Sequence, residues 1–221
     1  MHDLITETTR KLLAEIPPHV EAAAAAKTRT AEEVRAAVDG GIRIIAHNYV
    51  QEAEKMLPEI KTGVKWHLIG NLQKNKVKKA VRIFDMIETA DSMKLCEEID
   101  RRAGEEQKTM PVLVQVNIAG EKTKSGIGHE EAGRFLEETR HFKHVSVEGL
   151  MTIEPFAGTP EESRTYFRRM KKLFDELRNS HPAGGKLKYL SMGMSRTYKT
   201  GIEEGANIVR IGAGIFGPRE E

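Results

Sequence analysis

The chain has 221 residues, of which 39% are hydrophobic and 31% charged, and its formal net charge is only +2. This length accommodates one large domain with a substantial core, and the near-balance of charge gives no basis for a nucleic-acid groove or a membrane-binding face. A single cysteine, Cys96, excludes an intrachain disulfide and a cysteine-rich metal site. The N-terminal segment 1–16 carries acids and no continuous apolar stretch, so we expect no signal peptide, no membrane span and a cytoplasmic location.

Helical and strand patterns alternate along the chain. A helical stripe in segment 1–16 ends before Pro17, and apolar runs then alternate with amphipathic segments. Strands are predicted at residues 19–26, 42–46, 66–69, 83–87, 111–117, 145–150, 187–190 and 208–211. Helices are predicted at 30–38, 49–57, 73–81, 91–99, 129–141, 159–177 and 191–204. Capping boxes are expected at Thr30 with Glu33 and at Thr159 with Glu162.

Eight strands separated by helices favour parallel pairing with crossover helices. A closed barrel explains this number of strands better than an open sheet does. We therefore predict the α/β class, with a single (β/α)₈ TIM-type barrel, an extra N-terminal helix and one domain over residues 1–221. An open doubly wound sheet is the alternative.

Residues that could bind a ligand or take part in a reaction follow the predicted strands. In barrel enzymes the loops after the strands converge on one face, where reactions occur. The residues in this position are Lys27, Asn48, His67, Asn117, Met151, residues 191–195 and residues 210–214. If the strands are placed correctly, these residues share one rim.

Lys27 follows five alanines and would point into or across the mouth of the barrel. A lysine there is largely desolvated, which favours the neutral amine, the form that condenses with aldehydes. An ordinary exposed lysine at a strand end is the alternative interpretation.

The loops after strands seven and eight have the features of a phosphate site. Ser195 lies near the start of a short predicted helix, where backbone N–H groups are free. The run from Ile211 to Gly214 has little side-chain bulk, so its amides can approach an anion closely. Barrel phosphate sites are frequently built from these two loops, although the glycines could equally be turn formers.

A set of motifs adds a family resemblance to these features. The motifs are Lys27-Thr28, NYVQE at 48–52, WHLIGNLQKNK at 66–76, QVNI at 115–118, KSGI at 124–127, GLM at 149–151, LSMGMS at 190–195, VRIG at 209–212 and IFG at 215–217. In this order they resemble the YggS/PROSC family, the pyridoxal phosphate homeostasis proteins, over nearly the whole chain. Members of that family are similar in fold to the N-terminal barrel of alanine racemase.

The resemblance implies that the cofactor is pyridoxal 5′-phosphate (PLP), held as a Schiff base on Lys27. It implies that Asn48 lies near the pyridine ring and that Arg210 faces the ring nitrogen. It also implies a phosphate site made by Ser195 with the backbone N–H groups of Gly212 and Ala213. His67 and Met192 complete the expected cofactor-binding set, although a hydrogen-bonded core histidine is the alternative for His67.

Two positions depart from the family pattern. Ala46-His47 stands where members read Gly-Glu, so an imidazole replaces a carboxylate acceptor. Ala213 stands where a threonine is usual, which removes a hydroxyl from the expected phosphate site and keeps its N–H. We expect weaker phosphate binding and retention of the site.

An arginine at the ring nitrogen favours a carrier over an enzyme. The guanidinium keeps its protons, so the ring stays unprotonated and is a poor electron sink. The chain also ends after the barrel, without the second domain that completes alanine racemase. We therefore predict no catalytic or metal-binding residue, and a monomeric PLP carrier that releases its cofactor by transimination and supplies PLP-requiring apo-enzymes.

Three alternatives remain open from the sequence. They are a small PLP-dependent racemase or lyase, a PLP-independent Schiff-base aldolase, and an interaction module using the basic helix after Gly70. The lysines of that helix, at positions 74, 76, 78 and 79, are otherwise interpreted as a solvated face.

Overall fold

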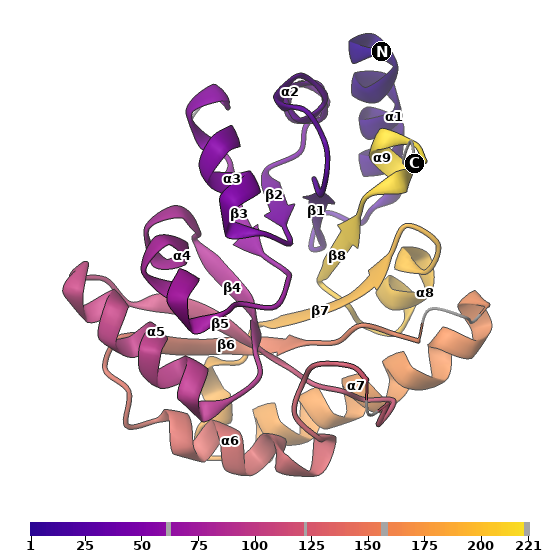
Figure 1. Cartoon of the computed structure of the whole chain (residues 1–221). Helices are drawn as coiled ribbons and strands as arrows, with labels where there is room; N and C mark the ends of the chain where they lie inside the picture. The colour runs from indigo at the N-terminus through magenta and orange to yellow at the C-terminus, as the bar shows by residue number, and fades with distance from the viewer. Residues whose placement is uncertain (61–62, 122, 156–158, 219–221) are drawn as a thin grey trace.

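Eight parallel strands close into a barrel in chain order in the computed structural model, which describes residues 1–60, 63–121, 123–155 and 159–218 (Figure 1). The strands are β1 (Glu21–Ala25), β2 (Ile44–His47), β3 (Lys65–Leu68), β4 (Met86–Ala90), β5 (Met110–Gln115), β6 (Val145–Met151), β7 (Tyr189–Met194) and β8 (Ile208–Ile211). Each strand pairs with the next, and β8 pairs with β1 to complete the circle. The predicted barrel is thus confirmed, and the open sheet is excluded.

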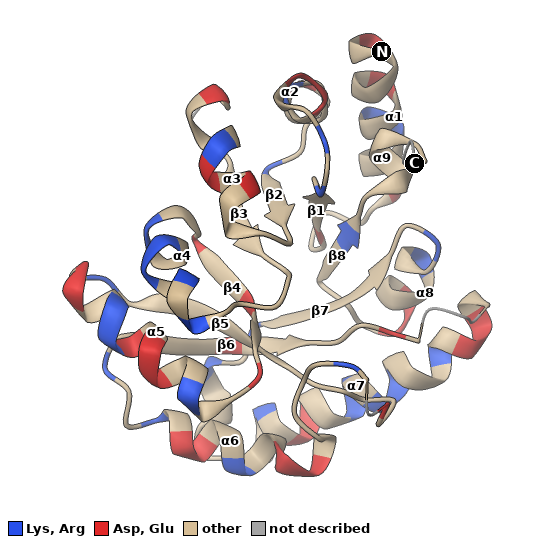
Figure 2. Ribbon diagram, viewed as in Figure 1, with Lys and Arg blue, Asp and Glu red and all other residues tan. Residues whose placement is uncertain are grey.

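The helices surround the barrel. They are α1 (His2–Glu15), α2 (Ala31–Asp39), α3 (Val50–Met56), α4 (Val77–Ile83), α5 (Met93–Glu105), α6 (Ala132–Thr139), α7 (Pro160–Ser180), α8 (Tyr198–Glu203) and α9 (Ala213–Phe216). The extra N-terminal helix α1 lies beside α9, so the two ends of the chain are close together (Figure 1). Acidic and basic residues are interspersed over these helices (Figure 2). Within the described ranges, every helix is too short or too polar to span a lipid bilayer.

Local sequence signals determine where two of the helices begin. The Thr30 hydroxyl accepts from the Glu33 N–H at 3.2 Å, and the Glu33 carboxylate accepts from the Thr30 N–H at 2.8 Å. Thr159 and Glu162 form the same reciprocal pair ahead of α7, with Pro160 in its first turn. Both predicted capping boxes are therefore confirmed, and each satisfies backbone N–H groups that have no partner within the helix.

Two strands lie further along the chain than their sequence patterns predict. Strand four is predicted at residues 83–87, but β4 is Met86–Ala90, and Ile83 is the last residue of α4. Strand seven is predicted at 187–190, but β7 continues to Met194, and α8 begins only at Tyr198. Polar and small residues inside these strands, Glu88 in β4 and Gly193 in β7, obscure the apolar pattern on which the predictions depend.

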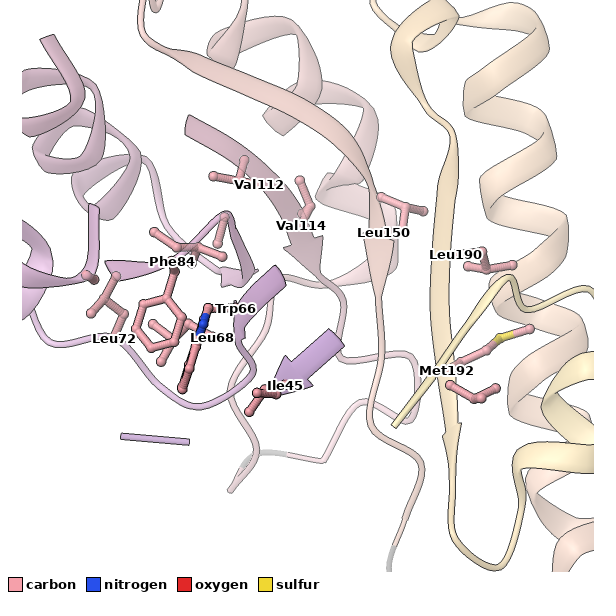
Figure 3. Packing of buried hydrophobic residues seen from close by; sticks show 14 of the residues in the cluster. Ile45, Trp66, Leu68, Leu72, Phe84, Val112, Val114, Leu150, Leu190 and Met192 are labelled. Atoms are coloured by element: carbon pink, nitrogen blue, oxygen red, sulfur yellow. The ribbon is translucent and has the colours of Figure 1, made fainter. Parts of the chain in front are cut away.

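Two apolar layers form on opposite faces of the strands. Outward residues pack against the helices in one large cluster, part of which is shown in Figure 3. A smaller cluster fills the barrel interior, with Ala23, Ile44, Ala46, Ile69, Met86, Leu113, Met151 and Ile208. Successive strand residues alternate between the two layers. In β1 the side chains of Ala23 and Ala25 face the barrel interior. Lys27 is two residues beyond Ala25, so the same alternation would direct it to the interior side.

Gly149 in β6 provides a test of this packing. A Cβ atom at this position would lie 2.0 Å from the carbonyl oxygen of Tyr189 in the neighbouring strand β7. Backbone atoms of a barrel strand cannot move away cheaply, so Gly149→Ala should lower the free energy of unfolding by about 3 kcal/mol. Gly185→Ala is the matched control, because a Cβ at that position would meet no atom within 4 Å. Urea unfolding that gives equal stabilities for the two variants would contradict this packing.

Candidate functional site

Lys27 lies at the mouth of the barrel, two residues beyond the last residue of β1. It is half-buried, so it is less desolvated than the sequence analysis expects. Its Nζ lies 5.5 Å from the centroid of the exposed Tyr49 ring, a cation–π arrangement. The next residue, Thr28, has a φ of 63°, and its hydroxyl donates to the Lys27 carbonyl at 2.6 Å. This left-handed residue turns the chain sharply after the lysine and keeps it on the rim.

Residues 212–214, here called the glycine loop, comprise the residue after β8 and the first two residues of α9, and they lie close to the end of β1. A Cβ at Gly212 would be 3.4 Å from the Ala25 carbonyl oxygen, which is a van der Waals contact. The Ser195 Oγ accepts from the N–H groups of Gly212 at 3.1 Å and Gly214 at 3.2 Å. Ala213 lies between these two glycines. The structure therefore brings Ser195, the glycine loop and the strand carrying Lys27 together, as the strand order predicts.

Arg29 joins the two ends of the chain at this point, and sequence reasoning missed it. One Nη1–H donates to the Glu33 carboxylate at 3.0 Å, and an Nη2–H donates to the Gly217 carbonyl at 2.7 Å. The same guanidinium lies 5.4 Å from the Phe216 ring centroid. Because Arg29 follows Lys27 so closely, these contacts hold the lysine turn and the glycine loop in a fixed relation.

A chain of hydrogen bonds between charged and polar groups lies inside the barrel below the mouth. Arg210 is 4% exposed, and its guanidinium donates to the Ser191 Oγ at 2.6 Å and to the Thr152 carbonyl at 2.7 Å. The Ser191 hydroxyl in turn donates to the Glu88 carboxylate at 2.6 Å. The other Glu88 oxygen lies 2.8 Å from His67 Nδ1. The network links β3, β4, β7 and β8.

Glu88 is the buried acid of this network and was absent from the sequence-based site. Burial alone would raise its pKa, but the hydrogen bond and charge of His67, the charge of Arg210 and the Ser191 hydroxyl together hold the pKa below its ordinary value. Glu88 therefore remains ionised and offsets the buried charge of Arg210. One sequence signal could have identified it, since it is two residues from Met86 and faces the same side of the strand.

The remaining expected residues lie in three different settings. Asn48 is half-buried on the rim. His67 is 2% exposed and hydrogen-bonded within the network, which matches its interpretation as a core histidine and places it beneath the mouth. The side chain of Met192 packs in the outer apolar layer, as Figure 3 shows. β7 extends through Met192 and turns this side chain away from the barrel interior, so the expected role of Met192 in the cofactor site stays a prediction and would have to come from its backbone.

A pocket of about 320 Å³ lies on the part of the rim that faces the glycine loop across the barrel. Its polar lining includes Asn48, Asn71, Gln115, Asn117 and Lys124. Asn48 and Asn117 were expected on the rim, whereas the contribution of the loop after β5 was not predicted. In the described ranges, no group of three or more His, Cys, Asp or Glu side chains is placed to hold a metal ion.

His47 is one of the two positions that depart from the family pattern, and its side chain lies on the outer face of β2. Its ring is fully buried and stacks on Trp66 with centroids 5.6 Å apart and an interplanar angle of 9°. Among the described residues, neither ring nitrogen has a hydrogen-bond partner, and the Glu52 carboxylate is 3.7 Å from Nδ1. Burial lowers the pKa of His47 to about 4, so the ring is neutral at pH 7.

The sequence of this chain is similar to one protein family and to several of its members. The family model for "Alanine racemase, N-terminal domain" matches residues 3–220. A "Pyridoxal phosphate homeostasis protein" of Aquifex aeolicus is 40% identical over 197 residues, which cover 89% of this chain and 86% of that protein. The protein of the same name from Escherichia coli K12 is 31% identical over 208 residues, or 92% of this chain and 88% of the other.

Solved structures agree with these sequence comparisons. The structure of PipY from Synechococcus elongatus "with PLP bound" has a TM-score of 0.89 and 33% identity, and the match covers 96% of this chain and 100% of PipY. An alanine racemase of Clostridium difficile has a TM-score of 0.81 at 15% identity, covering 99% of this chain and 57% of the racemase. At that identity the likeness concerns the fold alone.

The Glu88 network leads to a stability prediction. Glu88→Gln keeps an acceptor for Ser191 but leaves the buried Arg210 charge uncompensated, so we expect a loss of about 3 kcal/mol in the free energy of unfolding. Glu54→Gln is the control, because it removes a carboxylate from an exposed ion pair with Lys79 and should cost less than about 1 kcal/mol. Denaturant unfolding of both variants at pH 7 measures the difference, and equal small losses would contradict the proposed charge balance.

His47 leads to a pH prediction. Its folded pKa of about 4 lies below its ordinary value of 6.5, so the unfolded chain takes up a proton in this interval that the folded chain cannot. The stability contributed by neutral His47 is therefore complete above pH 6.5 and is lost as the pH falls through 4, by about 3 kcal/mol. In His47→Phe, which keeps a stacked ring, this part of the acid loss should be absent. Superimposable pH profiles of urea stability for the two proteins would refute the assignment.

Proposed function

Because the chain belongs to the alanine racemase N-terminal domain family, and within it to the pyridoxal phosphate homeostasis proteins, we propose that it holds PLP as a Schiff base on Lys27 and releases it by transimination. The proposal needs an amine that can reach an aldehyde and an anion site within the span of one small molecule. The observation that supports it is the close approach of Gly212 to the end of β1, where an added Cβ would be 3.4 Å from the Ala25 carbonyl oxygen, two residues before Lys27.

The two strands involved are neighbours in the closed barrel. β1 pairs with β8 in a register that puts Ala24 opposite Ile211, so Lys27 and the glycine loop both lie beyond the same edge of the same strand pair. PLP carries an aldehyde and a phosphate on adjacent parts of one ring. Lys27 and the glycine loop are therefore arranged to suit the aldehyde and the phosphate of this cofactor, respectively.

The phosphate would be held by Ser195 with the backbone N–H groups of the Gly212–Gly214 loop. Backbone amides without bulky side chains are suited to a doubly charged anion. Two of these amides already point at a single oxygen, the Ser195 Oγ. Because Ser195 Oγ accepts from both amides, its own O–H can donate to the anion. Ala213 contributes its N–H group only, as the sequence analysis expects.

Arg210 would face the pyridine nitrogen, and its surroundings favour a carrier. Hydrogen bonds to Ser191 and Thr152 fix its guanidinium, and the ionised Glu88 offsets its charge. A guanidinium in this state cannot give a proton to the ring nitrogen, and PLP supplies its electron-sink chemistry through a protonated ring. We therefore assign no catalytic residue. The chain's own contribution is to bind, orient and release the cofactor.

The proposed role of the protein in the cell depends on covalent and reversible binding of PLP. We propose that the protein is a monomer in the cytoplasm, and that incoming amines take PLP from Lys27 so that it can reach PLP-requiring apo-enzymes. The reversible bond on Lys27 gives retention, and the half-buried position of the lysine leaves it accessible to such amines.

The direct test is Lys27→Ala. Wild-type protein incubated with PLP should show the visible absorbance of a Schiff base, and borohydride reduction followed by mass spectrometry should find the pyridoxyl adduct on Lys27. The alanine variant should lose this band and bind PLP at least about tenfold more weakly, because only the phosphate and ring contacts remain. Lys65→Ala, at the opposite end of the barrel, should behave as wild type.

Three outcomes would overturn the proposal. An adduct elsewhere in a saturated sample would refute the assignment of Lys27. A colourless protein that takes up no PLP would favour the aldolase alternative. Racemisation or elimination of amino acids at enzyme-like rates, abolished in Lys27→Ala, would show an enzyme instead of a carrier.

A further inference from the structure

The pocket across the mouth from the glycine loop has a chemistry of its own. Four side-chain amides line it, from Asn48, Asn71, Gln115 and Asn117, together with the hydroxyl residues Thr123 and Ser125 and the cation Lys124. Among the residues that the structure describes, no carboxylate lines it. The positive charge of Lys124 and the amide donors that have no partner within the described part of the loop after β5 favour a small polar anion, and the volume of about 320 Å³ limits the size of the occupant.

The pocket begins beside Lys27. Ala25 of β1 is opposite Ala46 of β2, and the Ala26 N–H donates to the Ala46 carbonyl at 2.9 Å. Continuing this register places Lys27 next to Asn48, which is part of the pocket lining. The pocket therefore adjoins the segment that carries Lys27, on the side away from the phosphate loop.

Lys124 has a donor to spare for such an occupant. Its ammonium donates to the Glu154 carbonyl at 3.2 Å and pairs with the Glu121 carboxylate at 3.2 Å. A lysine has three N–H donors, so one has no partner among the residues that the structure describes. The pair with Glu121 is partly exposed, with 28% of the Lys124 and 37% of the Glu121 side chain accessible, so it holds the ammonium only weakly.

The amides of the pocket are held in place by the loop after β5. The Gln115 Nε2–H donates to the Ser125 carbonyl at 3.2 Å, and the Asn117 Nδ2–H donates to the Glu121 carbonyl at 2.8 Å. These bonds fix the loop that carries Lys124 against the end of β5. The polar groups are thus preorganised, which lowers the cost of binding a ligand.

From this lining we infer that the pocket binds the carboxylate of the amine that removes the cofactor, so that the preferred acceptor is a small α-amino acid. The inference rests on the proposed function, because it concerns the release step from Lys27. In that step the amino acid nitrogen forms a bond to the aldehyde-derived carbon as the bond from that carbon to Lys27 Nζ breaks. A proton passes from the incoming amine to Lys27 Nζ, and no oxidant or reductant is needed.

The experiment compares two amines that differ by the carboxylate. PLP-loaded protein is mixed with L-alanine or with ethylamine, and the rate of cofactor release is followed by visible absorbance. In Lys124→Met, which keeps the apolar stem without the charge, release by alanine should slow about tenfold, the equivalent of one charge-assisted hydrogen bond. Release by ethylamine should change less than about twofold. Lys65→Met at the far end of the barrel is the control and should alter neither rate.

A second measurement uses the cofactor-free protein and does not depend on loading. Titration with L-alanine, followed by amide NMR spectra, should shift the signals of Asn71, Asn117 and Ser125 in wild type and require a higher concentration in Lys124→Met. Ethylamine should not shift them. Equal slowing of both amines, no slowing of alanine, or alanine shifts confined to other residues would overturn the inference. Failure of PLP to load on Lys27 would instead refute the proposed function and leave the NMR result to decide on the pocket.

Discussion

The arrangement of the mouth depends on a buried arginine and the buried glutamate that compensates it. Arg210 and Glu88 both lie inside the barrel, where an unpaired charge would cost several kcal/mol, and the Ser191 hydroxyl connects them. Ser191 accepts from the arginine and donates to the carboxylate, so its single hydroxyl satisfies both groups. Because the partners come from β4, β7 and β8, and His67 adds β3, the network fixes half of the strands relative to one another as well as the direction of the guanidinium.

Closure of the barrel then brings the two ends of the chain to one place. Lys27 follows the first strand and Gly212 follows the last, and only the pairing of β1 with β8 makes them neighbours. Arg29 reinforces this pairing by bonding from the lysine turn to the carbonyl of Gly217. The interior contributes through small side chains on β1 and β2, where Ala23, Ala25 and Ala46 belong to the inner apolar cluster beneath the rim.

The sequence predicted the parts of this arrangement that depend on strand order. Residues directly after the strands converge on one rim in any barrel of this kind. The strand order alone therefore predicts that this rim carries Lys27, Asn48, Ser195 and Gly212. The interior network could not be predicted in the same way. Glu88 lies within a strand whose polar residues hide its apolar pattern, and its role appears only when residues from four strands meet. The end of strand seven was mispredicted for the opposite reason, because Gly193 resembles a turn residue although the strand continues to Met194.

His47 shows why a departure from a family pattern must be located before it is interpreted. In sequence it directly precedes Asn48, one of the expected cofactor residues, so it could be thought to alter the site. The alternation of β2 places it on the outer face, against Trp66 and the start of α3, whereas Ala46 occupies the interior position. Its neutral ring can therefore alter the acid stability of the β2–α3 packing without touching the rim. Ala213 is different, because it lies within the loop proposed to hold the phosphate. Of the two departures, only Ala213 lies in the proposed phosphate site, so we expect only this one to change cofactor affinity by direct contact, through loss of a hydroxyl while the backbone donors remain.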